Sequence, residues 1–346
     1  MATIRDVADA AGLPIPTVAR ILRGETKGRW ASARERTARV LKLAQELGYR
    51  PNLAAKAVAT GKTHAITLVI TTGPTGKSTL HESLVRNLAS TLEARHYHLN
   101  MAIFSEDELL SEEALPHFLQ ASYSDGFLIN FNKNIPPELP ACLERQSLPW
   151  LWLNYKYSHN AVYPDDFMAG QTAARYLLDL GHRQVAYFNA FHTPADAHYS
   201  EYDRQDGFCA CVQETTGVSA RLIQPLREKK RDGLVGHLYT ILQAPDRPTA
   251  ICTYSETSAS IVIAAAFAAG LKIPDDLSII TFGEKEAFCA LPLTAVRIPL
   301  GELGQDAVSI LLQRIENPQT APQPSRVLPV KDIIYPGSSV APPPGC

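Results

Sequence analysis

The sequence has no long apolar segment and few cysteines. Its 346 residues contain no uncharged apolar run of 18, which is about the length that a membrane-spanning helix needs. The first residues also lack the basic-then-apolar layout of a secretion signal, so we expect a cytoplasmic protein without a membrane partner. The six cysteines are scattered, and the one close pair, Cys209 and Cys211, does not have metal-site spacing. We therefore expect reduced, mostly packed thiols and no bound metal.

Signatures of catalysis are missing as well. His64, His81, His182 and His192 are dispersed, and none of them has metal-ligand spacing or a nucleophile elbow nearby. His182 lies in LGHR, where packing or capping at a helix end is the simpler interpretation. The sequence therefore predicts a protein that is not an enzyme and that needs no cofactor.

One segment carries part of a nucleotide-binding motif. The stretch ITLVITTGPTGKST combines a strand, a glycine loop ending in Gly76-Lys77-Ser78 and the start of a helix. The complete motif requires glycine where Thr71 stands, and no clear acidic strand for magnesium follows. We therefore expect no nucleotide hydrolysis here, although loop amides and a helix N-terminus attract anions.

Charge is divided unevenly along the chain. Residues 1–63 hold 12 Lys/Arg and 5 Asp/Glu, a net charge of +7, whereas the remainder holds 21 basic and 30 acidic residues, a net charge of −9. A small basic head on an acidic body favours a polyanionic partner for the head. A solvated surface remains the alternative when charge is considered alone.

The basic head has the pattern of three short helices. Thr3 can accept from the amide of Asp6 and so begin a helix that Gly12 ends. A second helix is predicted from about 15 to 23, and a third from Ser32, which with Glu35 would form a capping box. Helix, tight glycine turn and second helix make a helix-turn-helix layout, which predicts an all-α DNA-binding head.

From residue 65 onward, short apolar runs alternate with longer helical stretches. Strands are predicted at 65–71, 98–104, 126–130, 149–154, 184–189, 249–253 and 278–282. Helices are predicted near 79–95, 110–121, 168–180, 203–216, 256–270 and 301–316. This alternation favours two lobes with parallel sheets, and a ligand would bind in the cleft at the carboxyl ends of the strands.

The head resembles the lactose-repressor (LacI/GalR) family of transcription regulators. The resemblance rests on TIRDVADAAGLPIPTVARILRG and on RVLKLAQELGYRPNLAAKAVATGKT. It implies that the second helix reads bases in the major groove and that the segment after GYRPN forms a hinge helix in the minor groove. The DNA-contacting positions that it implies are Thr3, Ile15, Pro16, Thr17, Arg20, Tyr49, Asn52, Ala55 and Val58.

Some residues of the head depart from the family pattern. Pro14 stands where a serine cap is usual, and Ile15 and Pro16 can offer only apolar contacts to thymine methyl groups or read DNA shape. Arg20 is the best candidate for a bidentate contact to guanine. Val58 replaces the family's minor-groove leucine, so we expect a weaker wedge, unless Val58 merely lies on a small helix face.

The body resembles the same family and the periplasmic sugar-binding fold behind it. The stretches concerned are DDFMAGQTAARYLLDLGHRQVAYF, RQDGF, AAGLKIPDDLSIITFGE and LTAVRIPLGELGQDAVSILL. The resemblance therefore implies an all-α helix-turn-helix head joined to an α/β periplasmic-binding-protein-like body. The effector-binding positions that it implies are Thr71, Asn154, Asp165, Arg204, Ser255 and Glu284.

Two cationic side chains could shape the choice of effector. We hypothesise that Lys77 and Arg204 hold an acidic or phosphorylated sugar-like molecule, although an exposed loop lysine and a surface salt bridge are the plainer alternatives. Trp150 and Trp152 share one face of a predicted strand, where core packing is commoner than stacking on a sugar.

We expect a DNA-binding transcription regulator, most simply a repressor, that a sugar or acidic sugar derivative controls and that serves carbohydrate metabolism. Its partners would be double-stranded operator DNA, the effector and a second copy of the chain, either as a homodimer or within a tetramer. The alternative is a solute-binding protein for transport. The lack of a secretion signal and the presence of the basic head both argue against it.

The expected domains follow the changes in sequence pattern. They are a DNA-binding domain at 1–47, a hinge and linker at 48–63, an effector-binding body at 64–340 and a flexible tail at 341–346. Within the body, one lobe would comprise about 64–160 and 291–320, and the other about 161–290 and 321–340.

Overall fold

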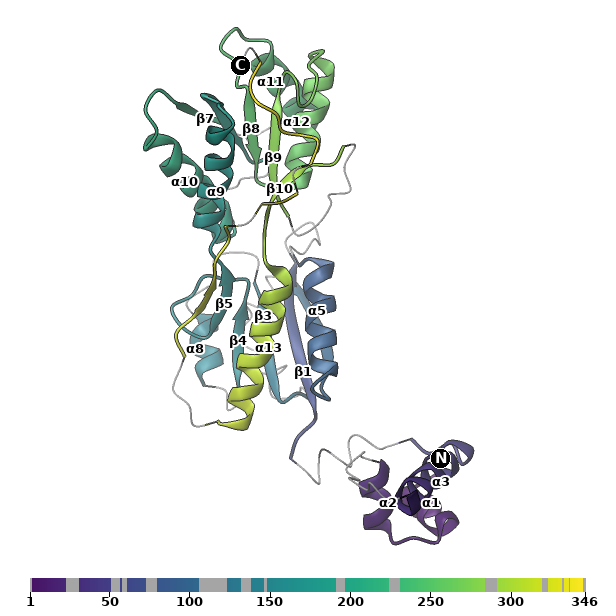
Figure 1. The fold of residues 1–346 in the computed structure, drawn as a ribbon. Helices are drawn as coiled ribbons and strands as arrows, with labels where there is room; N and C mark the ends of the chain where they lie inside the picture. Colours follow the sequence, from purple (N-terminus) through teal and green to yellow (C-terminus); the bar gives the residue numbers. More distant parts are fainter. Residues whose placement is uncertain are drawn as a thin grey trace. The chain divides into compact units, whose positions relative to one another are not determined.

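The computed structural model separates into two compact units, a head at Met1–His64 and a body at Ala65–Cys346 (Figure 1). The structure describes residues 2–22, 31–50, 57, 61–72, 80–105, 123–131, 138–145, 148–190, 197–223, 231–283, 291–318, 323–331, 333–335 and 337–344. The predicted helix at 110–121 lies outside these residues, as do His192 and most of the predicted hinge segment.

The head contains the three predicted helices. They are α1 (Ile4–Ala11), α2 (Ile15–Leu22) and α3 (Ala31–Glu46). Val7, Val18, Ile21 and Val40 are buried together in a small core to which all three helices contribute. The apolar stripe of each helix therefore faces the other two, as helical periodicity requires.

Local signals explain where the helices of the head begin and end. The Thr3 hydroxyl accepts from the Asp6 amide at 3.3 Å, and the Asp6 carboxylate accepts from the Thr3 amide at 2.7 Å, which completes a capping box. Gly12 follows α1 in the left-handed conformation, with φ of 64°. The expected capping box at Ser32 was misplaced: α3 already includes Ala31, so Ser32 lies within its first turn.

The body has two six-stranded sheets, and we refer to the part built on each as lobe 1 and lobe 2 (Figure 1). Lobe 1 has the order β11-β5-β4-β3-β1-β2 and is parallel throughout. Its strands are β1 (Ala65–Thr72), β2 (His98–Ser105), β3 (Gly126–Asn130), β4 (Trp150–Leu153), β5 (Ala161–Pro164) and β11 (Arg326–Leu328).

Lobe 2 has the order β12-β10-β9-β8-β6-β7, and only β12 runs antiparallel to its neighbour. Its strands are β6 (Gln184–Phe188), β7 (Ser219–Ile223), β8 (Ala250–Thr253), β9 (Ser278–Gly283), β10 (Thr294–Arg297) and β12 (Ile333–Tyr335). The prediction of two parallel-sheet lobes is therefore confirmed.

Helices cover both faces of these sheets. They are α5 (Glu82–Glu93), α8 (Glu138–Glu144), α9 (Asp166–Asp179), α10 (Tyr199–Gln213), α11 (Arg231–Leu242), α12 (Glu256–Ala268) and α13 (Leu300–Glu316). Along β6, Val185 and Tyr187 pack in the core that includes α9 and α10, whereas Ala186 and Phe188 pack in the core of α11 and α12. Strands buried on both faces read as continuous apolar runs, which is why the sequence revealed them.

The chain crosses between the lobes after β5, β10 and β11, so the expected lobe boundaries need correction. Residues 161–164 and 326–328 belong to the sheet of lobe 1, and 294–297 belong to that of lobe 2. These strands are short, and polar residues or proline interrupt them, so they lack the continuous apolar run that revealed β4 and β8. β7 and the helices α8 and α11 were also absent from the sequence-based prediction.

Glycines bring α9 and α10 into close contact. A Cβ atom at Gly170 would clash with the backbone oxygen of Arg204, and one at Gly207 would clash with that of Phe167. Because only glycine allows this approach, the helix that carries Arg204 lies directly against the start of α9.

The C-terminal segment is fastened to lobe 2. Ser339 is buried, and its hydroxyl donates to the Ile279 carbonyl at 2.6 Å. His182 contacts the Thr249 hydroxyl at 2.8 Å and the Ala341 carbonyl at 2.9 Å, which agrees with a packing role for this histidine. Ala341 was expected to begin the flexible tail, and it is instead held by two hydrogen-bonding partners, His182 and Ser278.

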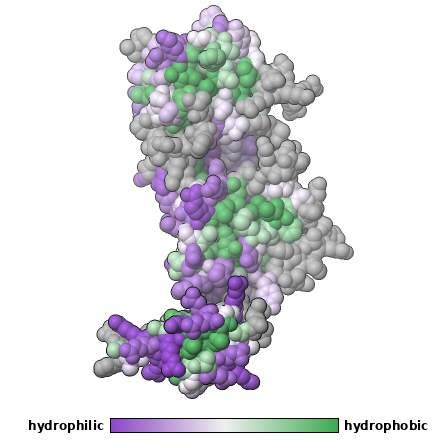
Figure 2. Space-filling view, turned by 90° about the vertical axis from the view of Figure 1, so that its right-hand side faces the viewer, coloured by the Kyte–Doolittle hydropathy of each residue, from purple (hydrophilic) through white to green (hydrophobic). Residues whose placement is uncertain are grey.

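Among the described residues, no helix is long and apolar enough to cross a bilayer. On the face drawn in Figure 2, the head is largely hydrophilic, whereas hydrophobic areas interrupt the surface of the body. Exposed large apolar side chains of the body include Met101 and Ile103 of β2 and Phe267 of α12.

Candidate functional site

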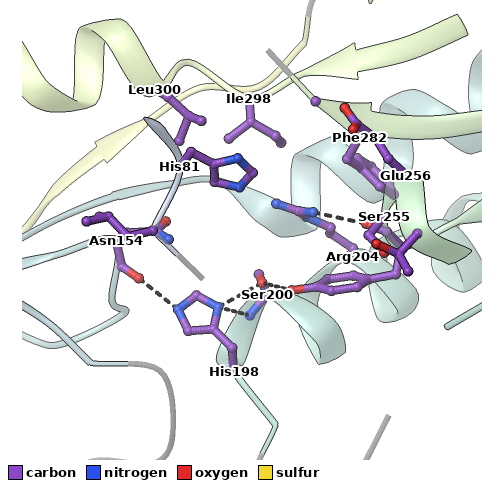
Figure 3. Close-up of a pocket in the computed structure, with 14 residues that line it drawn as sticks. His81, Asn154, His198, Ser200, Arg204, Ser255, Glu256, Phe282, Ile298 and Leu300 are labelled. Carbon is purple, nitrogen blue, oxygen red and sulfur yellow. Dashed lines mark hydrogen bonds between the residues drawn. The ribbon is translucent and has the colours of Figure 1, made fainter. Parts of the chain in front are cut away.

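A cavity of about 400 Å³ lies between lobe 1 and lobe 2 (Figure 3). Asn154 follows β4, Tyr254 and Ser255 follow β8, Phe282 and Gly283 end β9, and Ile298 follows β10. All of these residues lie at carboxyl ends of parallel strands. The cavity is therefore where the alternating strand and helix pattern placed a ligand cleft.

Three of the predicted effector-binding residues line this cavity, namely Asn154, Arg204 and Ser255. Thr71 and Asp165 are not among its lining residues. Thr71 is buried within β1, and Asp165 is the N-cap of α9, where its carboxylate accepts from the Met168 amide at 2.9 Å. The other two predicted residues, Lys77 and Glu284, lie outside the described residues.

Arg204 is held in place by a buried ion pair. Its Nε donates to Oδ1 of Asp166 at 2.6 Å, and its Nη1 donates to the Tyr254 carbonyl at 3.3 Å. The guanidinium carbon also lies 4.8 Å from the centre of the Phe282 ring. Burial opposes the charge of Arg204, but the Asp166 carboxylate outweighs it and raises the pKa of Arg204. The expectation of a surface salt bridge as the alternative role is wrong, since the pair is buried.

The ion pair leaves part of the Arg204 guanidinium for a ligand. Nη2 makes no hydrogen bond to the described residues, while Nε and Nη1 are both engaged. A fixed guanidinium with one uncommitted nitrogen can donate to a hydroxyl or carbonyl oxygen.

The cavity has a polar side and an apolar side. Leu80, Ile298 and Leu300 form apolar lining, while Ser200 and Thr257 supply hydroxyl groups. A lining with a few placed polar groups among apolar side chains suits a small organic ligand.

The charge of the described lining is nearly balanced. Asp166 compensates Arg204, and Glu256 is a lining carboxylate whose pKa is raised by burial. These groups give an incoming anion no excess of positive charge.

Sequence reasoning missed several lining residues, among them His81, His198, Ser200, Tyr254, Glu256 and Phe282. Ser200 lies four residues before Arg204 on α10, so the two side chains share one helix face. That spacing could have identified Ser200. His198 could not be found in this way, because it reaches the cavity as the N-cap of α10.

The tryptophan pair belongs to the core of lobe 1. Trp150 and Trp152 are buried with Phe127 and Ile129, and their rings meet edge to face with centroids 5.8 Å apart. Neither ring lines the cavity. Core packing is therefore the role that the structure gives them.

The predicted base-reading face of α2 is open. Val18 and Ile21 point into the core of the head, whereas Ile15, Pro16 and Arg20 are exposed and Thr17 is half-buried. The Pro14 carbonyl accepts from the amides of Thr17 and Val18, which starts the helix without a serine cap. Pro16 lies in the first turn, where a missing amide costs little.

The remaining predicted DNA contacts fall in three places. Thr3 caps α1 and is exposed, and Tyr49 packs partly against the core of the head. Asn52, Ala55 and Val58 lie outside the described residues.

Among the described residues, no group of three or more His, Cys, Asp or Glu side chains could hold a metal ion.

Comparisons with known proteins identify a related family for the head and another for the body. Residues 3–52 match the model of bacterial regulatory proteins of the lacI family, and residues 174–340 match a periplasmic binding protein-like domain. The Escherichia coli (strain K12) ribose operon repressor is 26% identical over 335 residues, covering 95% of this chain and 98% of that protein. The HTH-type transcriptional repressor PurR of Pectobacterium atrosepticum is 28% identical over 324 residues, covering 91% of each.

A solved structure shows the same fold. The lac repressor dimer bound to operator and the anti-inducer ONPF aligns with a TM-score of 0.74 at 19% identity, covering 98% of this chain and 99% of that one. The basic three-helix head, the two-lobed body and these likenesses lead to one conclusion. The chain carries the DNA-binding domain of the lacI family of bacterial regulatory proteins on a periplasmic binding protein-like body, and it is a DNA-binding transcriptional regulator.

Proposed function

We propose that the chain is a repressor of carbohydrate metabolism genes and that a sugar bound in the cavity between the lobes controls it. The observation that carries this proposal is the position of Arg204, which the buried Asp166 fixes at the carboxyl ends of both sheets. The ribose operon repressor is a relative over nearly the whole length of the chain, which supports a sugar as effector.

The head would bind operator DNA through α2. Arg20 is exposed on its outer face and is our candidate for the guanine contact, while Ile15 and Pro16 would touch thymine methyl groups. Thr3, Thr17 and Tyr49 would contact the phosphate backbone. We assign Asn52, Ala55 and Val58 to a hinge that enters the minor groove, within a linker at 48–63. A cytoplasmic location follows from this DNA partner.

A neutral sugar fits the described lining better than an anion does. Asp166 already compensates the charge of Arg204, and Glu256 adds a carboxylate to the cavity. An acidic or phosphorylated sugar would need a further cation, and Lys77 is our candidate for it. We retain Thr71 and Asp165 as contacts that a bound effector would gain only through rearrangement, and Glu284, outside the described residues, as a further candidate contact.

The active form would be a homodimer, which brings two heads to two half-sites of a near-palindrome. Met101 and Ile103 of the edge strand β2 are 50% and 63% exposed. Exposed apolar side chains on an edge strand invite pairing, so we propose that a second copy covers them. A tetramer would require a further interface.

Two experiments test these proposals. In a gel shift with the DNA upstream of its own gene, the full chain should bind, and a chain lacking residues 1–63 should not. Calorimetry of the full chain should then compare ribose and other neutral sugars with sugar acids and sugar phosphates. Tight binding of a neutral sugar that Lys77→Ala leaves unchanged would exclude the acidic effector. Binding of DNA by the truncated chain would refute the role of the head.

A further inference from the structure

Two polar contacts join lobe 1 to lobe 2 beside the cavity. Nζ of Lys156, just after β4, lies 2.7 Å from Oδ2 of Asp203 on α10. The Asn154 carbonyl, also after β4, lies 2.8 Å from Nε2 of His198. The ion pair is half exposed, whereas His198 is buried. Of the two, the histidine contact is therefore shielded from competing water.

The histidine contact continues into the cavity wall (Figure 3). Nδ1 of His198 lies 2.8 Å from Oγ of Ser200, which in turn lies 2.9 Å from Oη of Tyr254. Ser200 and Tyr254 both line the cavity. An unbroken chain of hydrogen bonds therefore runs from the hydroxyl of Tyr254, a residue that lines the cavity, to the backbone of the opposite lobe.

One end of this chain fixes its direction. A carbonyl oxygen can only accept, so Nε2 of His198 must carry the hydrogen that it donates to Asn154. In a neutral ring Nδ1 is then an acceptor, and the Ser200 hydroxyl donates to it. Because the Ser200 hydrogen is used there, the Tyr254 hydroxyl must donate to the Ser200 oxygen.

The surroundings of His198 favour the neutral ring. Burial lowers the pKa of His198 to about 4, although its bond to Asn154 and the Asp166 charge act in the opposite direction and Arg204 adds to the lowering. The rings of Tyr155 and Tyr199 pack against the imidazole, with centroids 6.1 and 4.5 Å away. Burial also raises the pKa of Tyr254, so its hydroxyl keeps its hydrogen at neutral pH.

We propose that His198 is a specificity-determining positioning residue, whose Nε2–H tautomer ties the lobes together and turns the Tyr254 hydroxyl oxygen into an acceptor toward the cavity. With the Tyr254 hydrogen committed to Ser200, an effector can meet that oxygen only with an O–H or N–H group. Arg204 Nη2, by contrast, offers only donors. This inference rests on the proposed function, and it narrows the effector to molecules that carry a donor and an acceptor at these two places.

The test reads the tautomer directly in the full chain, without DNA or effector. Long-range ¹H–¹⁵N spectra of protein labelled with ¹⁵N-histidine distinguish protonated from unprotonated ring nitrogens, and His198→Gln identifies the signals of His198. We expect a protonated Nε2 and an unprotonated Nδ1 that do not titrate between pH 7.5 and 5.5. Ser200→Ala should shift the Nδ1 signal of His198, because that nitrogen loses its hydroxyl donor at 2.8 Å and keeps only the longer bond, 3.4 Å, from the backbone amide of residue 200.

His182 supplies a matched control within the same spectrum. It too is buried between a hydroxyl, Thr249 Oγ1, and a carbonyl, that of Ala341, but it lies away from the cavity lining. Thr249→Ala should shift the Nδ1 signal of His182 and leave that of His198 in place, and Ser200→Ala should do the reverse.

Three outcomes would overturn the proposal. In the first, Nδ1 of His198 is protonated and Nε2 is not. In the second, His198 titrates near the pKa of an ordinary histidine. In the third, the Nδ1 signal of His198 is unchanged in Ser200→Ala. Each of these would leave the gel shift and calorimetry results standing. Conversely, a failure of DNA or sugar binding would leave the tautomer result intact, so the two proposals fail separately.

Discussion

Nε of Arg204 lies 2.6 Å from Oδ1 of Asp166, and the two side chains are only 13% and 1% exposed. Removing one partner of such a pair leaves the other charge buried without compensation. We expect Arg204→Met to lower the free energy of unfolding by about 3–5 kcal/mol. Urea denaturation of the full chain measures this loss. The double variant Arg204→Met, Asp166→Leu should recover most of it, and a double variant as unstable as the sum of the single variants would contradict the coupling.

The contact between α9 and α10 should tolerate no side chain at its glycines. Gly207→Ala would place a methyl group against the Phe167 carbonyl, which is backbone and cannot rotate away. We expect a loss of about 1–3 kcal/mol in unfolding free energy, as is typical of overpacking. Gly236→Ala in α11 is the control: nothing lies within 4 Å of its added carbon, so it should be neutral or slightly stabilising. Equal losses of stability at the two glycines would show that the effect of Gly207→Ala comes from helix propensity and not from close packing.

Stability should depend on pH through His198. Its folded pKa of about 4 lies below the ordinary histidine value of 6.5, so the folded state resists a proton that the unfolded state accepts. The contribution is fully present above pH 6.5 and is lost as the pH falls toward 4, by about 3 kcal/mol in all. The measurement is the unfolding free energy of the wild type minus that of His198→Gln at each pH. A difference that stays constant from pH 7.5 to 4 would argue against a buried neutral ring.

Arg20 should read one base of the operator. Replacing it by alanine removes the proposed bidentate contact, and we expect a loss of about 1–3 kcal/mol with relaxed preference at one position. Binding titrations against single-base operator variants measure both effects. Lys42→Ala is the control: Lys42 pairs with Glu46 on α3, outside the proposed reading helix α2, so its loss should not change the preference for any base. An unchanged base preference in the Arg20 variant would assign the reading to another residue.

The exposed face of β2 should hold the dimer together. Met101→Glu and Ile103→Glu would place carboxylates in an apolar contact, so we expect the mass in solution to fall to that of the 37.9 kDa chain. Sedimentation or light scattering measures the mass. His98→Glu, at an exposed position on the opposite face of the strand, should leave the mass unchanged. A dimer that survives both substitutions would place the interface elsewhere.

Much of the fold could be predicted from the sequence because helix caps and apolar runs are local signals. Thr3 with Asp6 and Gly12 delimit a helix by themselves, and apolar runs such as 65–71 report strands buried on both faces. β5, β10 and β11 were missed or assigned to the wrong lobe because these short strands, unlike β4 and β8, are not continuous apolar runs. Their sheet membership is decided by pairing with distant strands.

The sequence by itself determined the basic helical head and the alternating body, since both depend on residue type and short-range spacing, and the family resemblance of RQDGF singled out Arg204. Only the tertiary structure decided what surrounds Arg204: Asp166 lies 38 residues away, and glycines on two helices bring them together. Likewise, His198 reaches Asn154 across 44 residues of chain. Which group donates a hydrogen bond, and which charge compensates a buried one, depend on contacts between residues far apart in the chain. No local sequence pattern specifies those contacts.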